Sequence, residues 1–250
     1  MRRVLVASLA IAAATAFGCS TSGGVDTRER TPADRGRVLV AGPTLSPSRD
    51  NAFTCTTCHD ESPQPPRAGR AMPGAPLAGA LKRPSFWGGR IFTPGDAVDE
   101  CVVRFMQGPR LDRSTEPAKE LYAFLGSLDA GASGATEQPF TVVRLAEDLP
   151  PGDVTRGANV WSLTCAKCHG DIHTGARRLK SVSGAALAAV LPEDTVVAHE
   201  IYGPVGVRQA VIEKVRHGSF LGVEGVMPPF SREALGDADL ADVMSYLGLY

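Results

Sequence analysis

The sequence predicts an all-α protein with two helical halves that follow one plan. The first observation is a repeated C-x-x-C-H motif, at Cys55–His59 and again at Cys165–His169. The second is apolar residues at offsets 0, 3, 4 and 7, the spacing of one face of a helix. This spacing occurs in three sets: Val98, Cys101, Val102 and Phe105; Leu121, Phe124, Leu125 and Leu128; and Leu240, Val243, Met244 and Leu247. The third is the lack of a convincing alternating strand outside the short segment Phe140–Leu145.

The first helix is expected to begin after Thr31, because this capping hydroxyl precedes Pro32 at the first helical position. Gly42 and Pro43 supply its stop. Residues 62–95, which follow the first motif, are rich in Pro and Gly. This composition predicts irregular backbone wrapping a ligand rather than a sheet.

Two more helices are expected in the first half. Asp96 is expected to cap the earlier one, and Gly108-Pro109 to end it. Ser114 or Thr115 is expected to cap the later one. The chain then becomes rich in Gly, Ala and Ser, which indicates a linker.

The second half repeats the plan. An amphipathic helix is expected over Val154–Thr164, with Trp161 one turn before Cys165. Asp237 is expected to cap the last helix. Another apolar stripe, closed by Gly218, consists of Val207, Val211 and Val215.

The C-x-x-C-H spacing has a chemical reason. Two thiols three positions apart can form thioether links to both vinyl groups of one porphyrin, and the adjoining imidazole points at the iron as proximal ligand. We therefore expect two covalently bound haem c groups, attached and ligated by Cys55, Cys58 and His59 and by Cys165, Cys168 and His169. A zinc site built from the four thiolates is the alternative, but it leaves both histidines unexplained. The expected fold is two tandem cytochrome c domains, each wrapped around one haem.

The N-terminus has the pattern of a secretory signal. Arg2 and Arg3 precede an apolar run that is too short to span a bilayer comfortably. Ala16-Phe17-Gly18-Cys19 resembles a bacterial lipobox, so Cys19 is expected to carry lipid and to anchor the protein on the periplasmic side of a membrane; ordinary cleavage is the alternative. The expected organisation is a signal peptide over 1–18, a tether over 19–30, cytochrome domains over 31–130 and 153–250, and a linker over 131–152.

Export also affects how the cysteines are interpreted. Spare thiols usually pair in an oxidising compartment, yet with four cysteines assigned to haem and Cys19 to lipid, Cys101 has no partner.

Removal of residues 1–18 leaves 24 basic and 27 acidic residues, a net charge near −3, so nucleic acid is not expected as a partner. The expected partners are redox proteins, such as other cytochromes, a quinol-linked complex or a terminal oxidase. The lipid anchor is the expected membrane contact.

The second haem is expected to have a methionine as its distal ligand. Met227 begins a Met-Pro-Pro run between the Val215 stripe and the last helix. This run resembles the distal methionine loop of class I cytochromes c, which implies a His169/Met227 pair suited to electron transfer. If Met227 only fills space, His199 or His217 would replace it as ligand.

The first haem leaves three distal ligands open: Met72, Cys101 and Met106. The segment from Cys101 to Gly108, together with the Leu121–Leu128 helix, resembles a segment of dihaem thiosulfate dehydrogenases, whose cysteine at this point is the distal haem ligand. Thiolate-ligated haems also occur in the cytochrome subunits of sulfur-oxidation complexes.

The resemblance implies catalytic roles in the first half. It implies a His59/Cys101 shell, Arg104 as an anion contact, and an enzyme that joins two thiosulfates to tetrathionate. Residues 62–113 hold eight basic and four acidic residues, a charge that would attract such a small anionic sulfur substrate.

A second resemblance competes with the first. The segments 37–60 and 83–86 resemble those of dihaem peroxidases, which keep one haem open for peroxide, but the sequence does not clearly supply the acid and base groups such a pocket needs. We expect electron transfer between a donor and an acceptor, with the sulfur-compound oxidoreductase, the peroxidase and a redox or gas sensor as alternatives.

Overall fold

The computed structural model describes residues 30–64, 67–129, 138–141, 143, 145–219 and 225–250. Its regular structure is helical, which confirms the all-α prediction. In these residues β pairing is limited to two isolated bridges, Phe86–Ile91 and Lys180–Ala186, and the described residues of 140–145 form no strand. Among the described helices, none combines the length and the apolar character that crossing a bilayer requires.

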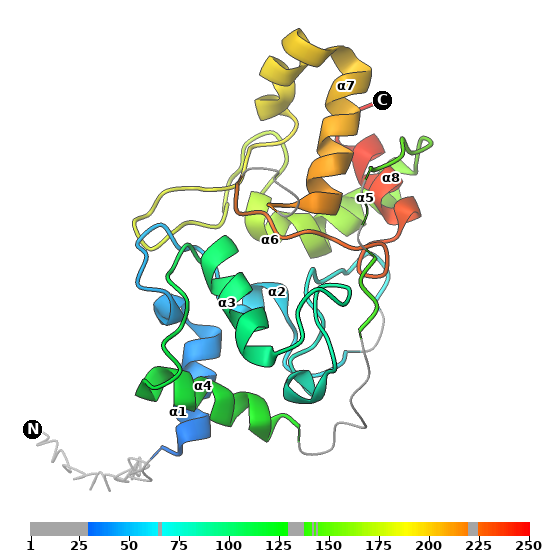
Figure 1. Cartoon of the computed structure of the whole chain (residues 1–250). Coiled ribbons are helices and arrows are strands. Elements are labelled where there is room, and N and C mark those ends of the chain that lie inside the picture. The colour runs from blue at the N-terminus through cyan, green and yellow to red at the C-terminus, as the bar shows by residue number, and fades with distance from the viewer. Residues whose placement is uncertain (1–29, 65–66, 130–137, 142, 144, 220–224) are drawn as a thin grey trace, which may run out of the picture.

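The helices fall into two groups along the chain (Figure 1). The first group is α1 (Pro32–Ala41), η1 (Pro43–Leu45), α2 (Cys55–Cys58), η2 (Ala80–Lys82), α3 (Pro94–Arg104) and α4 (Glu116–Ser127). The second is α5 (Val154–Val160), the π-helical turn η3 (Trp161–Cys165), α6 (Ala166–His169), η4 (Glu193–Thr195), α7 (Val196–His217, interrupted at Gly203) and α8 (Asp237–Tyr246).

Several predicted helix boundaries are confirmed. Thr31 caps α1 through a capping box with Asp34, and Pro32 occupies the first helical position. Thr115 is the N-cap residue of α4. The helix predicted over Val154–Thr164 is present as α5 and the π-helical turn that continues it.

Two predicted caps are wrong. The N-cap of α3 is Thr93, whose hydroxyl accepts from the backbone N–H of Asp96 (3.1 Å). Pro94 favours this earlier start, because the fixed φ of proline suits the first position of a helix. The N-cap of α8 is Gly236, so Asp237 is the first helical residue. Its carboxylate still lies in the first turn, where an anion stabilises the helix.

The two groups share one packing arrangement, in which the first helix packs against the last: α1 against α4, and α5 against α8. Each crossing is centred on a glycine. A Cβ at Gly36 would lie 2.0 Å from the backbone oxygen of Glu120, and one at Gly157 would lie 2.0 Å from that of Asp242. The backbones therefore approach at distances that only glycine allows.

An ion pair flanks each crossing at the same place. Arg35, just before the first glycine, pairs with Glu120. Arg156, just before the second, pairs with Asp242, with Nε and Oδ2 2.8 Å apart. The same glycine, arginine and carboxylate thus recur in both groups.

Each group has its own apolar core. The N-terminal core includes Val40, Leu45, Phe53, Val102, Phe105, Met106, Leu121, Phe124 and Leu125. The C-terminal core includes Val160, Trp161, Val207, Ile212, Leu235, Leu240, Val243, Met244 and Leu247. The stripes of α4 and α8 predicted from the 0, 3, 4, 7 spacing contribute to these cores.

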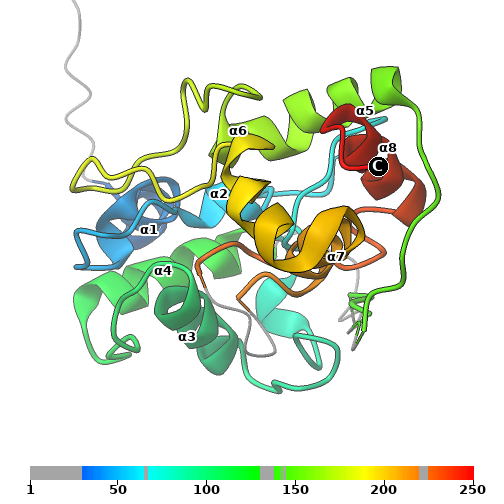
Figure 2. The same cartoon turned by 90° about the horizontal axis from the view of Figure 1, so that it is seen from above.

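Hydrogen bonds join the two groups. The hydroxyl of Thr164 accepts from the buried N–H of Ala71 (2.8 Å) and donates to Gly69 O (2.9 Å). The N–H of Val182 donates to Asn51 O (2.9 Å). The view from above shows α2 and α6 on the facing sides of the two groups (Figure 2).

Candidate functional site

The first C-x-x-C-H motif forms the single turn α2. The hydroxyl of Thr54 caps it by accepting from the N–H of Thr57 (3.2 Å), and the N–H of His59 donates to Cys55 O (2.9 Å). Cys55, Cys58 and His59 line one cavity of about 540 Å³. This volume lies within the range of about 300–1,000 Å³ found for ligand pockets.

The imidazole of His59 is oriented from one side. Its Nδ1 lies 2.6 Å from the carbonyl oxygen of Ala75, which makes Nδ1 the donor and leaves Nε2 as a free acceptor. The backbone at Gly74 lies against the ring, since a Cβ there would be 2.2 Å from Cε1 of His59. Burial lowers the pKa of His59, which favours the neutral imidazole that binds a metal.

The second motif is delivered by the continuous run of α5, η3 and α6. Nδ1 of His169 lies 3.0 Å from Ala189 O, so Nε2 is again the free nitrogen. Burial also lowers the pKa of His169. The ring of Trp161 lies beside this imidazole, with centroids 5.8 Å apart, and its Nε1 donates to Gly170 O (3.1 Å).

A backbone hydrogen bond recurs at the two motifs as well. The carbonyl of Cys58 accepts from Gly74 N, and that of Cys168 accepts from Leu179 N, each at 3.0 Å. Sequence reasoning identified the cysteines and histidines but missed these backbone partners, because a carbonyl or amide has no residue-type signal.

The five described cysteines are free thiols. Burial raises the pKa of Cys55 to about 11 and the pKa values of Cys101 and Cys165 to about 12. It also raises the pKa values of Cys58 and Cys168. In both motifs, unpaired thiols next to an imidazole with a free Nε2 fit the thioether attachment and proximal ligation of a haem. A haem bound there would supply one-electron redox chemistry.

The three proposed distal ligands of the first site all line the first cavity: Met72, Cys101 and Met106. Cys101 is on α3 and packs against the N-terminal core. Met106 belongs to that core and is 4% exposed. Met72 lies two residues before Gly74, whose backbone lies against the ring of His59.

Met227 packs against the C-terminal core. Its carbonyl accepts from Ser219 N (2.9 Å), and a Cβ at Gly218, whose φ is +57°, would lie 2.3 Å from the same oxygen. Arg216, which sequence reasoning missed, is buried on α7 and donates to Phe230 O (3.1 Å), directly after Pro229, and to Leu235 O (2.7 Å). These contacts fix both ends of the Met-Pro-Pro loop, and Pro228 and Pro229 reach the first cavity.

His217 is engaged at both ring nitrogens. Nδ1 lies 2.8 Å from the carboxylate of Glu213, and Nε2 lies 2.5 Å from Val143 O. These contacts leave no nitrogen of His217 for a metal. The side chain of His199 and the whole of Cys19 lie outside the described residues.

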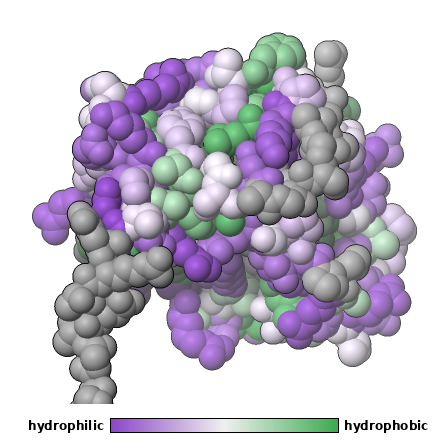
Figure 3. Space-filling model, turned by 90° about the horizontal axis from the view of Figure 1, so that it is seen from below, coloured by the Kyte–Doolittle hydropathy of each residue, from purple (hydrophilic) through white to green (hydrophobic). Residues whose placement is uncertain are grey.

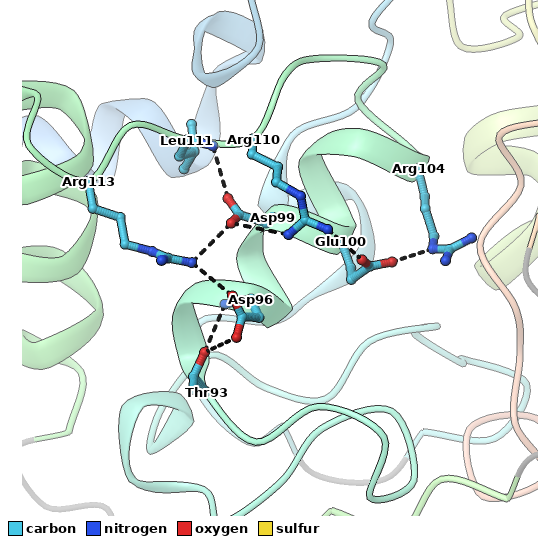
Figure 4. A network of polar contacts seen from close by, with 8 residues as sticks. All are labelled: Thr93, Asp96, Asp99, Glu100, Arg104, Arg110, Leu111 and Arg113. Carbon is cyan, nitrogen blue, oxygen red and sulfur yellow. Dashed lines mark hydrogen bonds and ion pairs between the residues drawn. The ribbon is translucent and has the colours of Figure 1, made fainter.

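Arg104 belongs to a network of ion pairs along α3 (Figure 4). It pairs with Glu100, which also lies 3.5 Å from Arg110. Arg113 contacts Asp99 (3.0 Å), whose side chain is 5% exposed. The carboxylates of α3 thus offset three of the basic residues in the 62–113 segment.

Three basic residues outside this network line the first cavity: Arg67, Arg70 and Arg83. Arg70 makes a two-point contact with Asp60, at 2.6 and 2.9 Å. Arg83 donates to the carbonyls of Pro76 and Ala78. The positive charge at this cavity therefore comes from the loop before α3 rather than from Arg104.

Residues 152–247 match the family model described as "Cytochrome C oxidase, cbb3-type, subunit III". This part of the chain is similar to a c-type cytochrome domain, the class that binds haem c covalently and transfers electrons. The matched residues contain the second C-x-x-C-H motif and Met227.

A similar solved structure is the thiosulfate dehydrogenase (TsdBA) from Marichromatium purpuratum in its "as isolated" form. The similarity has 18% sequence identity and a TM-score of 0.42, and covers 89% of this chain and 47% of that chain. The chain thus spans about half the length of that protein. No curated protein matches the chain.

Proposed function

We propose that the chain is a dihaem c-type cytochrome that passes single electrons between a donor and an acceptor protein. The observation that carries this proposal is the repeated histidine arrangement. His59 and His169 each follow two thiols, and each directs Nδ1 to a backbone carbonyl so that Nε2 is free. The repeated glycine crossings support one haem domain on each side of residues 131–152.

The expected location follows from the chemistry of attachment. Thioether formation takes place after export, and residues 1–18 have the composition of a secretory signal. We therefore expect the mature chain on the periplasmic side of a bacterial membrane, attached by lipid at Cys19. Labelling with radioactive palmitate tests the anchor: wild type should be labelled, Cys19→Ser should not, and an unlabelled wild type would contradict it.

A redox titration tests the number of electrons. Two haems should take up two electrons per chain, in one-electron steps that the visible absorption spectrum follows. Iron analysis of the same sample should give two atoms per chain. Uptake of one electron by protein that contains one iron would contradict the proposal.

The second haem is assigned His169 and Met227 as its ligands. The support is the fixed loop: the backbone of Met227 and Pro228 lies against Gly218, and both nitrogens of His217 are already engaged. Such a His/Met pair would suit electron relay, because it would change little on oxidation, and the methionine would also raise the reduction potential.

The first haem is assigned Cys101, which gives a second candidate function. The thiol lies on the cavity wall with Cys55, Cys58 and His59, and this cavity also contains Arg67, Arg70 and Arg83. A sulfur-compound oxidoreductase would use that charge to bind two thiosulfates. Forming the S–S bond of tetrathionate releases two electrons, which would leave one at a time through the haems to the acceptor.

Low-temperature EPR of the oxidised protein distinguishes the ligand sets. The first haem should give a low-spin His/thiolate signal that disappears in Cys101→Ser, whereas Met72→Leu should keep it. Two His/Met signals would contradict the cysteine ligand, and a high-spin signal would favour the peroxidase-like alternative.

Steady-state turnover distinguishes an enzyme from a relay. With thiosulfate and ferricyanide, the sulfur hypothesis requires two ferricyanides reduced per tetrathionate formed. It also requires that Arg83→Gln raise the KM more than Arg104→Gln, because Arg83 lines the cavity. No turnover by protein with both haems would leave electron relay as the function.

A further inference from the structure

The two C-x-x-C-H segments are in direct contact through one side chain. Lys167 lies between the two cysteines of the second motif, and its Nζ donates to the carbonyls of Thr56 (3.2 Å) and Thr57 (3.1 Å). Those two residues lie between the cysteines of the first motif. The contact therefore joins the attachment segments themselves, across about 110 residues of sequence.

The contact completes the hydrogen bonding of α2. The last four carbonyls of a helix have no partner within the helix. In this single turn, Cys55 O accepts from His59 N and Cys58 O accepts from Gly74 N. Lys167 supplies the partner for the other two carbonyls, at the end of the helix where a cation is favourable.

The ammonium of Lys167 is adjacent in sequence or in space to one cysteine of each motif. Its contact Thr57 directly precedes Cys58, and Lys167 itself directly precedes Cys168. Cys168 in turn packs against the N-terminal core that surrounds the first cavity. A single positive charge is thus placed between the two attachment sites.

We propose that Lys167 is a positioning residue that couples the two haem sites, by clamping the first attachment segment to the second and by placing one positive charge beside both. This inference rests on the proposed dihaem function. The clamp sets the separation of the two sites. The charge favours the reduced state at both, because reduction lowers the positive charge of the bound iron.

Redox titration and hydrogen exchange of the matured protein test the proposal. Lys167→Gln should lower both midpoint potentials and accelerate exchange of the amides of residues 55–59 several-fold. Lys167→Arg keeps the charge and should preserve both properties. Lys119→Gln removes an equal charge from the outer part of α4, where Lys119 pairs with Glu116, and should change neither.

The outcomes separate this inference from the proposed function. Wild-type protein with fewer than two haems would refute the dihaem function itself. If Lys167→Gln carries two haems but has wild-type potentials and exchange, the positioning role is refuted while the dihaem function stands. If Lys167→Gln fails to mature while Lys167→Arg and Lys119→Gln mature normally, the clamp is confirmed.

Discussion

At the scale of single residues, the chemistry depends on side chains that a sequence motif predicts and on backbone groups that it does not. The cysteines and histidines of the two motifs could be predicted because thioether attachment requires that spacing. The carbonyls of Ala75 and Ala189, which orient the imidazoles, could not, since any residue provides a carbonyl. The contact of His217 with the carbonyl of Val143 could not be predicted either, because Val143 is far away in sequence, in the segment expected to be a linker.

Glu233 gives a prediction at this scale. Its carboxylate lines the first cavity and accepts from the backbone N–H of Thr141 (2.9 Å) and from the hydroxyl of the same residue. Burial acts to raise the pKa of Glu233, but the hydrogen bonds from Thr141, together with those from Ser231 and from the backbone of Glu233 itself, lower it from 4.5 to about 2. The stability from this group is therefore present above pH 4.5 and is lost as the pH falls towards 2.

Glu233→Gln should cost about 0.5–1 kcal/mol at pH 7, the lower part of the range for a hydrogen bond because the residue is exposed. Urea denaturation at several pH values measures this. The difference between variant and wild type should shrink between pH 4.5 and pH 2. A difference that stays constant over this interval would contradict the assigned hydrogen bonds.

At the scale of elements, amphipathic helices were predictable and their starts were less so. The stripes of α4 and α8 follow from the 3.6-residue period. The start of α3 was missed because Asp96 and Thr93 are both acceptable caps, and Pro94 decides between them. The glycine crossings were also missed, since a close approach of two backbones depends on helices far apart in sequence.

A methyl group added at the crossing of α5 and α8 should destabilise the folded protein. Gly157→Ala would place Cβ 2.0 Å from Asp242 O and 2.8 Å from Cβ of Tyr246, so the helices must move apart. The variant should lose about 1–3 kcal/mol of unfolding free energy in a chemical denaturation experiment. Gly126→Ala is the matched control: its nearest neighbour is Leu81 Cδ1 at 3.8 Å, and it should gain about 0.5–1 kcal/mol. Equal effects at the two positions would contradict the crossing.

At the scale of the whole molecule, the two groups are joined through the segments that precede and follow the first motif. The face seen from below is mainly hydrophilic, with small apolar areas between polar ones (Figure 3). The contacts at Lys167, Thr164 and Val182 are formed by residues that look like ordinary surface polar or apolar positions in the sequence. Two similar halves could therefore be predicted, but their arrangement could not.

Thr164 provides a test of this arrangement. Thr164→Val removes the oxygen that accepts from the buried N–H of Ala71 and leaves that group without its partner. The expected cost is about 1–3 kcal/mol, measured by urea denaturation followed by far-ultraviolet circular dichroism. Thr155→Val, on the exposed surface of α5, is the control and should stay within about 0.5 kcal/mol of wild type. A neutral Thr164→Val would contradict the contact between the two groups.

Both C-x-x-C-H motifs are expected to hold a covalent haem. Peptide mass spectrometry of protein matured with a cytochrome c assembly system tests it most directly. We expect one haem adduct on the peptide with Cys55 and Cys58 and a second on the peptide with Cys165 and Cys168. A haem adduct on only one of these peptides, with free thiols on the other, would contradict it.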